Sequence, residues 1–252
     1  MRIEHPEEKD IPALRQLWKV VFGDEDAFLD RFFSLAFAPE RCLCAREGTV
    51  LAAMIHWLPC SRGNDRLGYL YAVATAPEFR GRGICRALME AAHTAMKEAG
   101  YTGALLYPQE EGLREMYRKM GYETATYIGE SICSCGMEPA PMHPVTPEEY
   151  IRLRRDFLPQ QSVVQEFPFI QLMAADFRFY KGLGFLLAAR EEKDHLYGAE
   201  LLGDPHTMPG ILCSLGLPFA RFRSPGGKLP FAMFRALIPG AEAPAYFGLP
   251  LD

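Results

Sequence analysis

The chain lacks long hydrophobic runs, a strong excess of either charge, and a cysteine pattern. Its longest apolar runs are about ten residues or fewer, whereas a membrane-spanning helix needs ~20. The net charge is −5, so the chain as a whole has no basic footprint for nucleic acid. The first eight residues contain no apolar stretch, so we expect no secretory signal. The 7 cysteines are an odd number spread along the chain, which argues against a secreted disulfide scaffold and favours the cytoplasm.

The composition is that of a folded globular protein, with 49% hydrophobic and 23% charged residues. A length of 252 residues allows one large domain or two small ones. In the first half, periodicity predicts helices, then strands, then alternating strands and helices. The predicted ranges are helices 10–21, 26–35, 84–99 and 110–120, and strands 41–47, 49–58, 67–75, 103–107 and 122–134. This order indicates a mixed α/β unit, with a sheet flanked by helices.

A proline-rich segment separates this unit from the rest of the chain. Residues 137–145 read as a linker, so we expect domains at 1–136 and 146–252. In the second half, Thr146-Pro147-Glu148-Glu149 predicts a helix start. Further expected elements are a helix over 163–179, a hairpin of 185–191 with 195–202, a short helix over 209–215, and strands 220–223 and 230–237. Cys44-Ala45-Arg46-Glu47 is echoed by Ala188-Ala189-Arg190-Glu191, which suggests a shorter α+β half of related architecture.

The most informative segment is a predicted strand that runs into a glycine-rich turn and a helix, over residues 70–88. The first N–H groups of a helix have no intrahelical partner, and glycines let an anion approach them closely. Arg80, Arg82 and Arg86 add positive charge, so the segment is typical of a phosphate cradle. It is neither a P-loop nor a dinucleotide fingerprint, because it lacks Gly-Lys-Ser/Thr and has Arg86 where the fingerprint needs a third glycine. The alternative is an ordinary helix start on a basic surface.

Taken whole, this segment resembles the acyl-CoA-binding motif of the GCN5-related N-acetyltransferase (GNAT) superfamily, in particular its enhanced intracellular survival branch. Arg80, Gly83 and the following helix match, whereas Cys85 replaces the usual small final residue. The resemblance implies that acetyl-CoA is the acyl donor. It also implies that the strand pairs with the pantetheine arm while the loop holds the pyrophosphate. The cofactor-binding residues implied are Val73, Ala74, Thr75, Arg80, Gly81, Arg82, Gly83, Ile84 and Cys85.

A second match is Tyr117, followed by Gly121-Tyr122 at the end of a predicted helix. In the superfamily such a tyrosine lies near the CoA sulfur, and the resemblance makes Tyr117 the catalytic acid for the departing thiolate. A neutral phenol can donate that proton. The alternative is a tyrosine that packs the helix against the sheet.

The general base is open among several residues. The candidates are His56, Tyr71, Glu130 and the terminal carboxylate of Asp252. By resemblance Asp252 would be catalytic, and Asp24, Glu25, Asp26, His56 and Tyr71 would line the acceptor site. Structural interpretations are the alternatives. The acidic residues between the first two helices fit helix caps, His56 fits an ordinary strand position, and the C-terminal tail fits packing for stability.

No metal site is expected, because Cys42-x-Cys44 and Cys133-x-Cys135 lack the spacing of common zinc sites. The sequence therefore predicts a cytoplasmic N-acetyltransferase that acts on an amine of a small molecule or peptide, with no nucleic-acid or membrane partner. A non-catalytic acyl-CoA-binding or partner-binding module is the main alternative, and a nucleotide-binding protein is a third. The acceptor and the oligomeric state are not readable from the sequence.

Overall fold

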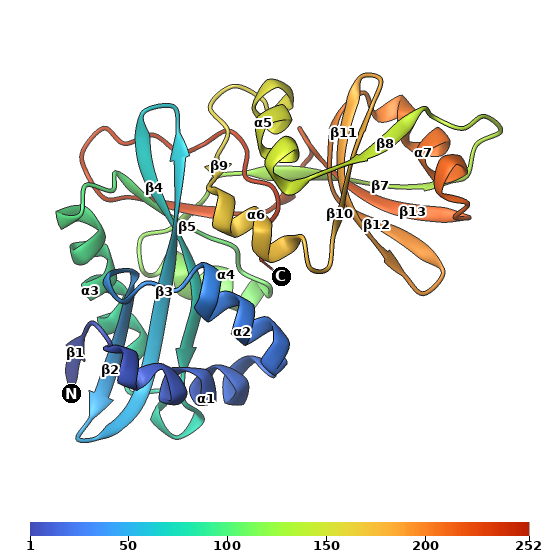
Figure 1. Cartoon of the computed structure of the whole chain (residues 1–252). Helices are drawn as coiled ribbons and strands as arrows, with labels where there is room; N and C mark the ends of the chain where they lie inside the picture. The colour runs from blue at the N-terminus through green and yellow to red at the C-terminus, as the bar shows by residue number, and fades with distance from the viewer. Residues whose placement is uncertain (252) are drawn as a thin grey trace. The chain divides into compact units, whose positions relative to one another are not determined.

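A computed structural model describes residues 1–251, apart from the side chain of Phe167. The chain divides into two compact units. The first comprises Met1–Leu106, Glu110–Glu123 and Phe234–Ala243, and the second comprises Tyr107–Gln109, Thr124–Met233 and the chain from Pro244 onward. Each unit holds a mixed sheet with helices beside it (Figure 1). The expected mixed α/β class is therefore confirmed.

The first unit is built on a sheet with the strand order β1-β2-β3-β4-β5-β15-β6. Its strands are β1 (Arg2–Glu4), β2 (Cys42–Glu47), β3 (Val50–Arg62), β4 (Asp65–Thr75), β5 (Gly103–Leu106), β15 (Met233–Ala236) and β6 (Glu123–Thr124). From β1 to β4 the neighbours are antiparallel, whereas β4 and β5 are parallel. A parallel pair needs a crossover, which α3 supplies.

The helices of the first unit are α1 (Ile11–Phe22), α2 (Asp26–Leu35), α3 (Ile84–Glu98) and α4 (Glu111–Arg118), with short 3-10 turns η1 (Glu8–Asp10), η2 (Pro39–Arg41) and η3 (Pro77–Phe79). The helix α1 ends at Gly23, whose φ of 77° is the left-handed conformation expected of a helix C-cap. The buried face of α3 carries Leu88, Ala92 and Met96. The helix passes so close to β4 that a side chain on Gly68 would meet Met96.

The second unit has a sheet with the order β14-β7-β13-β12-β11-β10-β8. Its strands are β14 (Leu229–Pro230), β7 (Tyr127–Ser134), β13 (Phe219–Pro225), β12 (His195–Gly203), β11 (Phe185–Glu192), β10 (Arg178–Gly182) and β8 (Met142–Val145); the other elements are β9 (Val164–Gln165), α5 (Pro147–Phe157), α6 (Phe167–Met173), η4 (Pro205–Thr207) and α7 (Met208–Leu215). Thr146 caps α5 as expected, because its Oγ1 accepts a hydrogen bond from the Glu149 amide at 3.2 Å. Part of the core lies between α7 and the sheet, where Ile211 and Leu212 pack with Phe222.

The two sheets share one topology. In the first unit two helices precede an antiparallel run that ends in the parallel pair β4–α3–β5. In the second unit, α5 and α6 precede an equivalent run that ends in the parallel pair β12–α7–β13. The likeness that the sequence suggested is therefore present in the topology. However, Arg46 lies in β2 whereas Arg190 lies in β11, and the strand equivalent to β2 is β10. The four-letter match compares non-equivalent strands.

Three predicted elements are broken in the structure. The strand expected over 122–134 is divided into β6 and β7, which belong to different sheets, and the strand expected over 230–237 is divided into β14 and β15. Buried Thr126 lies at the first break, where its Oγ1 accepts from the Ala232 amide at 3.0 Å. The helix expected over 163–179 is shortened to α6 and flanked by β9 and β10. Alternation along the chain shows which residues can form a strand, but not where the strand changes sheets.

The division into units also differs from the expected domains. The second unit begins at Thr124 rather than after the proline-rich segment, and Phe234–Ala243 returns to the first unit. The segment expected to be a linker contains β8, which pairs with β10 from Val145 opposite Phe179 to Met142 opposite Gly182.

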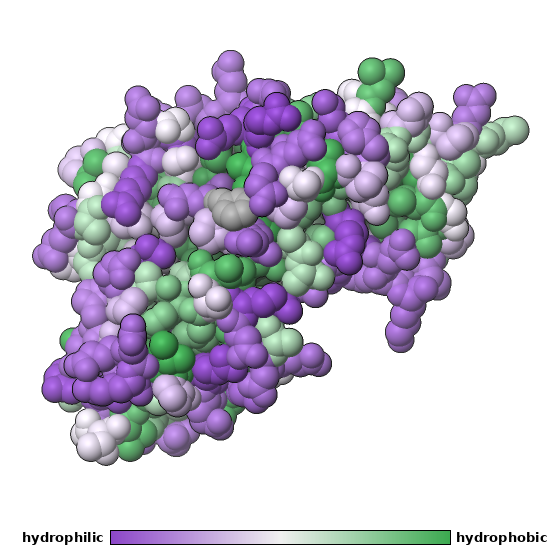
Figure 2. Space-filling model, viewed as in Figure 1, coloured by the Kyte–Doolittle hydropathy of each residue, from purple (hydrophilic) through white to green (hydrophobic). Residues whose placement is uncertain are grey.

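Hydrophilic side chains cover most of the face shown in Figure 2, with hydrophobic ones scattered between them. Among the residues described, no helix is both long enough and apolar enough to cross a membrane.

Candidate functional site

The edge of β4 next to β5 is paired over only part of its length. The parallel register runs from Leu67 opposite Gly103 to Tyr69 opposite Leu105, whereas β4 continues to Thr75. β5 ends at Leu106, so among the described strands none pairs with this edge of β4 beyond Tyr69. An open strand edge can bind an extended ligand, because its main-chain groups recognise the ligand as they would another strand.

A β-bulge lies within this open section of β4. The register with β3 shifts between Tyr71 and Ala74, so that Ala72 and Val73 stand opposite a single residue of β3. Ala72 has a φ of 50°, a left-handed conformation that costs a non-glycine residue free energy. Because a bulge turns peptide groups out of the regular ladder, the main chain at Val73 is re-aimed where the sequence predicts contact with a pantetheine arm.

The glycine loop joins the end of β4 to α3. Gly81 and Gly83 have φ values of 74° and 76°, and an added Cβ at either would meet no neighbour within 4 Å. The requirement for glycine there is therefore conformational, with open space above the loop. The first intrahelical bond runs from the Ala87 amide to the Gly83 carbonyl at 3.1 Å. The amides of Ile84 and Cys85 precede it in the first turn and are available to an anion.

The arginines of the loop also brace it. Arg80 Nε donates to the Thr75 carbonyl at 3.2 Å, and Arg82 Nη2 donates to the Glu78 carbonyl at 2.9 Å. Arg86 Nη1 donates to the Lys119 carbonyl at 3.3 Å, which ties the first turn of α3 to the end of α4. All three side chains stay exposed, so each adds positive charge beside the loop while fixing its shape.

Tyr117 lies on the last turn of α4 and is buried, with 7% of its surface exposed. Burial raises the pKa of its phenol above the usual value, and the nearby Cys85 thiol raises it further. The phenol therefore stays protonated at any physiological pH. Cys85 lies in the first turn of α3, so the structure places Tyr117 near the start of the helix that carries the glycine loop.

A polar network that the sequence did not reveal runs from buried Tyr122 and His93, next to Tyr117, to half-buried Arg235 and exposed Glu90. The rings of Tyr117 and Tyr122 meet edge to face at 6.0 Å between centroids, and Tyr122 Oη lies 2.6 Å from His93 Nε2. Arg235 Nη1 donates to His93 Nδ1 at 3.0 Å and to Glu90 at 2.9 Å. Since an arginine can only donate, His93 must donate to Tyr122 through Nε2. Burial and then the Arg235 charge lower the pKa of His93 to about 4. No sequence signal pointed to this network, because Arg235 is far from Glu90 and His93 along the chain.

His56 lies among aromatic rings and is 2% exposed. Trp18, Phe32 and Phe37 lie 5.3–5.9 Å from it between centroids, and its Nε2 lies 3.8 Å from Cys42 Sγ. Burial lowers its pKa to about 3, so the imidazole is neutral and too weakly basic to hold a proton near pH 7.

The same aromatic cluster contains Tyr71, on the open part of β4. Tyr71 is half-buried, and its ring lies 5.6 Å from Trp18 and 5.8 Å from Phe32 between centroids. Phe28 and Phe33 are also half-buried and contact Trp18. The abundance of phenylalanine between residues 28 and 37 was the sequence signal for this cluster.

The acidic residues between α1 and α2 are engaged locally. Asp24 accepts a hydrogen bond from the Trp18 indole Nε1 at 2.7 Å. Asp26 lies within ion-pair distance of Lys19 at 2.8 Å and Arg15 at 3.3 Å, and Lys19 lowers its pKa. Glu25 is the N-cap residue of α2. These contacts explain Asp24 and Asp26 structurally, whereas Glu25 takes part through its carbonyl, which accepts from the Leu29 amide at 3.2 Å.

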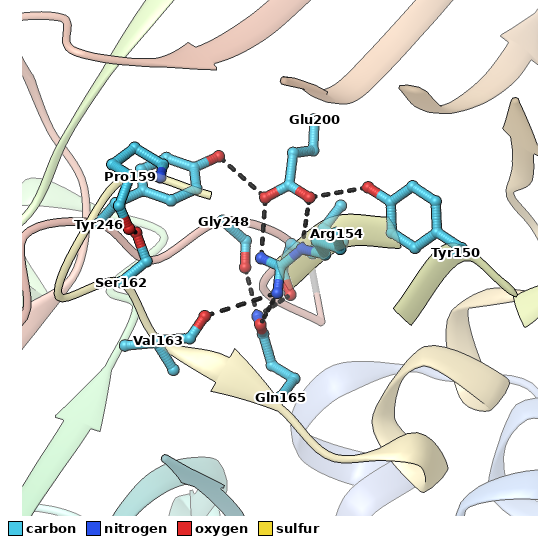
Figure 3. A network of polar contacts seen from close by, with 10 residues as sticks. Tyr150, Arg154, Pro159, Ser162, Val163, Gln165, Glu200, Tyr246 and Gly248 are labelled. Atoms are coloured by element: carbon cyan, nitrogen blue, oxygen red, sulfur yellow. Dashed lines mark hydrogen bonds and ion pairs between the residues drawn. The ribbon is translucent and has the colours of Figure 1, made fainter. Parts of the chain in front are cut away.

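The C-terminal segment is anchored within the second unit (Figure 3). Tyr246 Oη donates to Glu200 at 3.0 Å, and the Val163 amide donates to the Tyr246 carbonyl at 2.8 Å. Gln165 Nε2 donates to the Gly248 carbonyl. Asp252, the predicted catalytic carboxylate, lies outside the described residues.

Glu130, another candidate base, lies on β7 of the second unit. Its Oε1 is 3.2 Å from both Arg221 and Arg223 on β13. This ion-paired position accounts for the residue without a catalytic role. Among residues 1–251, no group of three or more His, Cys, Asp and Glu side chains could hold a metal ion.

The fold and this site define a class. A strand that runs on past the end of its parallel neighbour, bulges, and continues through a glycine loop into a helix N-terminus is suited to an extended ligand that ends in phosphate. Comparison with known proteins gives the same class. The family model described as the acetyltransferase (GNAT) domain matches residues 2–125. Residues 2–125, just under half of the chain, therefore match the GNAT acetyltransferase domain.

One curated relative is a mycothiol acetyltransferase from Propionibacterium freudenreichii subsp. shermanii, 29% identical over 93 residues. The match covers 36% of this chain and 30% of the relative, so the chain spans about a third of that protein's length.

Solved structures resemble both halves of the chain. A GCN5-related N-acetyltransferase from Anabaena variabilis has a TM-score of 0.75 at 16% identity, over 94% of this chain and 73% of that one. Eis1 from Mycobacterium abscessus has a TM-score of 0.70 at 14% identity, over 94% of this chain and 74% of that one. At such identities the likeness shows a shared fold.

Proposed function

We propose that the protein is an acetyl-CoA-dependent N-acetyltransferase that moves an acetyl group to an amine by direct attack in a ternary complex. The observation that carries this proposal is the open, bulged edge of β4 running into the glycine loop at the start of α3. The edge suits the amide-containing pantetheine arm, and the loop suits the pyrophosphate.

The roles of the residues follow from their positions. Main-chain groups of Val73 and Thr75 pair with the pantetheine arm, while amides from Gly81 to Cys85 hold the pyrophosphate. An N–H on the open part of β4 meets the oxyanion as the amine attacks the thioester carbonyl. Tyr117, kept protonated by burial, gives its proton to the departing thiolate.

The acceptor is an amine of a small molecule or peptide in the cytoplasm. Tyr71 connects the open part of β4 to the aromatic cluster around Trp18 and Phe33. Aromatic faces attract cations, so this cluster suits the apolar or cationic body of an amine. His56 packs beside Trp18 and Asp24 accepts from its indole, so both serve as structural supports of that wall. The base is Asp252 or a water molecule, since His56 is too weakly basic.

The test combines binding and turnover. Calorimetric titration with CoA should give a Kd within the ~1 µM–1 mM range typical of enzyme substrates, and ATP should not compete at equal concentration. Incubation with acetyl-CoA and a broad amine panel should release CoA. The released CoA should be measured by chromatography, because the protein's own thiols would also react with a thiol reagent. Absence of CoA binding would sink the proposal. Tight CoA binding without turnover on any amine would favour the non-catalytic module instead.

A further inference from the structure

Two cysteines far apart in sequence lie side by side in the second unit. Cys135 follows β7 and is exposed, and Cys213 lies on α7 and is half-buried. Desolvation, and then the neighbouring Cys213 thiol, raises the pKa of Cys135, whose Sγ donates to the Gly136 carbonyl at 3.3 Å. From the sequence, Cys135 was considered only together with Cys133, as a pair whose spacing does not fit zinc, and Cys133 packs against the core.

The chain around Cys135 is held along α7 by several bonds. The Cys135 amide donates to the Pro218 carbonyl and the Gly136 amide to the Pro209 carbonyl, both at 2.9 Å. Cys213 lies between these two prolines. The backbone at Cys135 and Gly136 is therefore fixed beside α7, the helix that carries Cys213, and beside the turn that follows it.

The same segment is fixed further along. The Ala140 amide donates to the Gly210 carbonyl at 2.9 Å, and Ser214 Oγ donates to the Ala140 carbonyl at 2.6 Å. An added side chain on Gly136 would lie 3.0 Å from Pro209. This packing leaves the segment little room to move away from α7, and a disulfide requires the two Cα atoms to stay within about 7 Å of each other.

We propose that Cys135 and Cys213 form a dithiol site that low-molecular-weight disulfides convert reversibly to an intramolecular disulfide. The exposed Cys135 thiolate attacks one sulfur of the small disulfide, which forms a mixed disulfide and releases one small thiolate. The Cys213 thiolate then attacks the Cys135 sulfur and displaces the second small thiolate. The two cysteine sulfurs are oxidised by two electrons, the small disulfide is reduced by two, and each released thiolate takes one cysteine proton.

Such a site protects Cys135 from a lasting adduct and reversibly fixes the end of β7 to α7. A lone exposed cysteine would keep the small thiol as an adduct, whereas a neighbouring thiol removes it. The disulfide joins the end of β7 to α7, and thiol reductants restore the dithiol. Nothing in this chemistry involves acetyl transfer, so the site stands independently of the proposed activity.

The test treats the native full chain with excess oxidised glutathione and maps its peptides by mass spectrometry. We expect loss of two hydrogens, a Cys135–Cys213 cross-linked peptide, and full reversal by dithiothreitol. In Cys213→Ser, Cys135 should instead retain one glutathione. Cys133→Ser, altered two residues away, should oxidise as the wild type does. A lasting glutathione adduct on wild-type Cys135, or a disulfide between two chains, would overturn the proposal.

A second probe needs no oxidant. Phenylarsine oxide bridges two thiols that lie within reach of one arsenic atom. The native protein should bind one equivalent at this site, and both Cys135→Ser and Cys213→Ser should lose that binding while Cys133→Ser keeps it. Equal binding in all three variants would contradict the pairing even if one variant were less stable.

Discussion

Arg154 and Glu200 form a two-pronged ion pair in the interior of the second unit, with Nε–Oε2 at 2.6 Å and Nη2–Oε1 at 2.9 Å. Their side chains are 2% and 0% exposed. Tyr150 and Tyr246 donate to the remaining lone pairs of the carboxylate, so the buried charge is fully hydrogen-bonded (Figure 3). A side chain on Gly248 would collide with the same carboxylate. The pair thus ties α5 and β12 to the C-terminal segment.

Removing one partner should destabilise the second unit strongly. Arg154→Met leaves an unpaired buried carboxylate, which we expect to cost about 3–5 kcal/mol of unfolding free energy. Arg154→Met combined with Glu200→Leu should recover part of that loss, because the buried charge is then gone. Urea unfolding followed by far-ultraviolet circular dichroism measures both.

The matched control for this prediction is Arg152→Met. Arg152 is on the same helix, but its pair with Glu149 is exposed and 3.7 Å long, so its loss should be below about 1 kcal/mol. Equal effects of the two arginine variants would contradict the assigned importance of burial.

The glycine loop predicts a selective loss of cofactor binding. Gly83→Ala puts a side chain on a left-handed residue, at a cost of about 1–2 kcal/mol. Rearrangement of the loop to relieve this strain should weaken CoA binding by roughly tenfold. Gly100→Ala is the control, since Gly100 has a φ of 82° at the other end of α3. Calorimetry should find lower CoA affinity only in Gly83→Ala. Equal CoA affinities would remove the loop from the binding site.

Tyr117 predicts a loss of rate without a loss of affinity. Tyr117→Phe keeps the ring but removes the proton donor, so kcat should fall by about 10²-fold or more while CoA binds as before. Tyr127→Phe, at a residue 44% exposed on β7, should leave kcat unchanged. If Tyr117→Phe kept full kcat, the proton would have to come from another group or from water.

Much of the cofactor side of the site could be predicted from the sequence, because it depends on short segments. The glycines at 81 and 83, the helix from Ile84 and the strand before them follow one another along the chain, so local rules apply. The bulge at Ala72 could not be predicted, since it is defined by the register against β3. The open edge of β4 was expected only from the family resemblance, which implies that this strand pairs with the pantetheine arm.

The polar networks were beyond sequence reasoning for the same reason. Arg235 reaches His93 only because Phe234–Ala243 returns to the first unit, and Glu200 meets Arg154 only when β12 packs beside α5. His56 illustrates the opposite error. A histidine in a strand is a candidate base, whereas burial among aromatic rings lowers the pKa of His56 to about 3 and leaves it too weakly basic near pH 7.

The buried His56 predicts a loss of stability on acidification. Its pKa is about 3 in the folded protein and 6.5 in the unfolded chain, where burial is absent. Between these pH values the unfolded chain binds the proton and the folded chain does not. Stability is therefore complete above pH 6.5 and falls with pH down to about 3, by about 1.4 kcal/mol per pH unit for one proton. In His56→Leu this slope should be smaller by about that amount between pH 6 and 4. Both tryptophans, Trp18 and Trp57, lie in the first unit, so their fluorescence follows its urea unfolding at each pH. Identical slopes in the variant and the wild type would mean that His56 takes up its proton without unfolding.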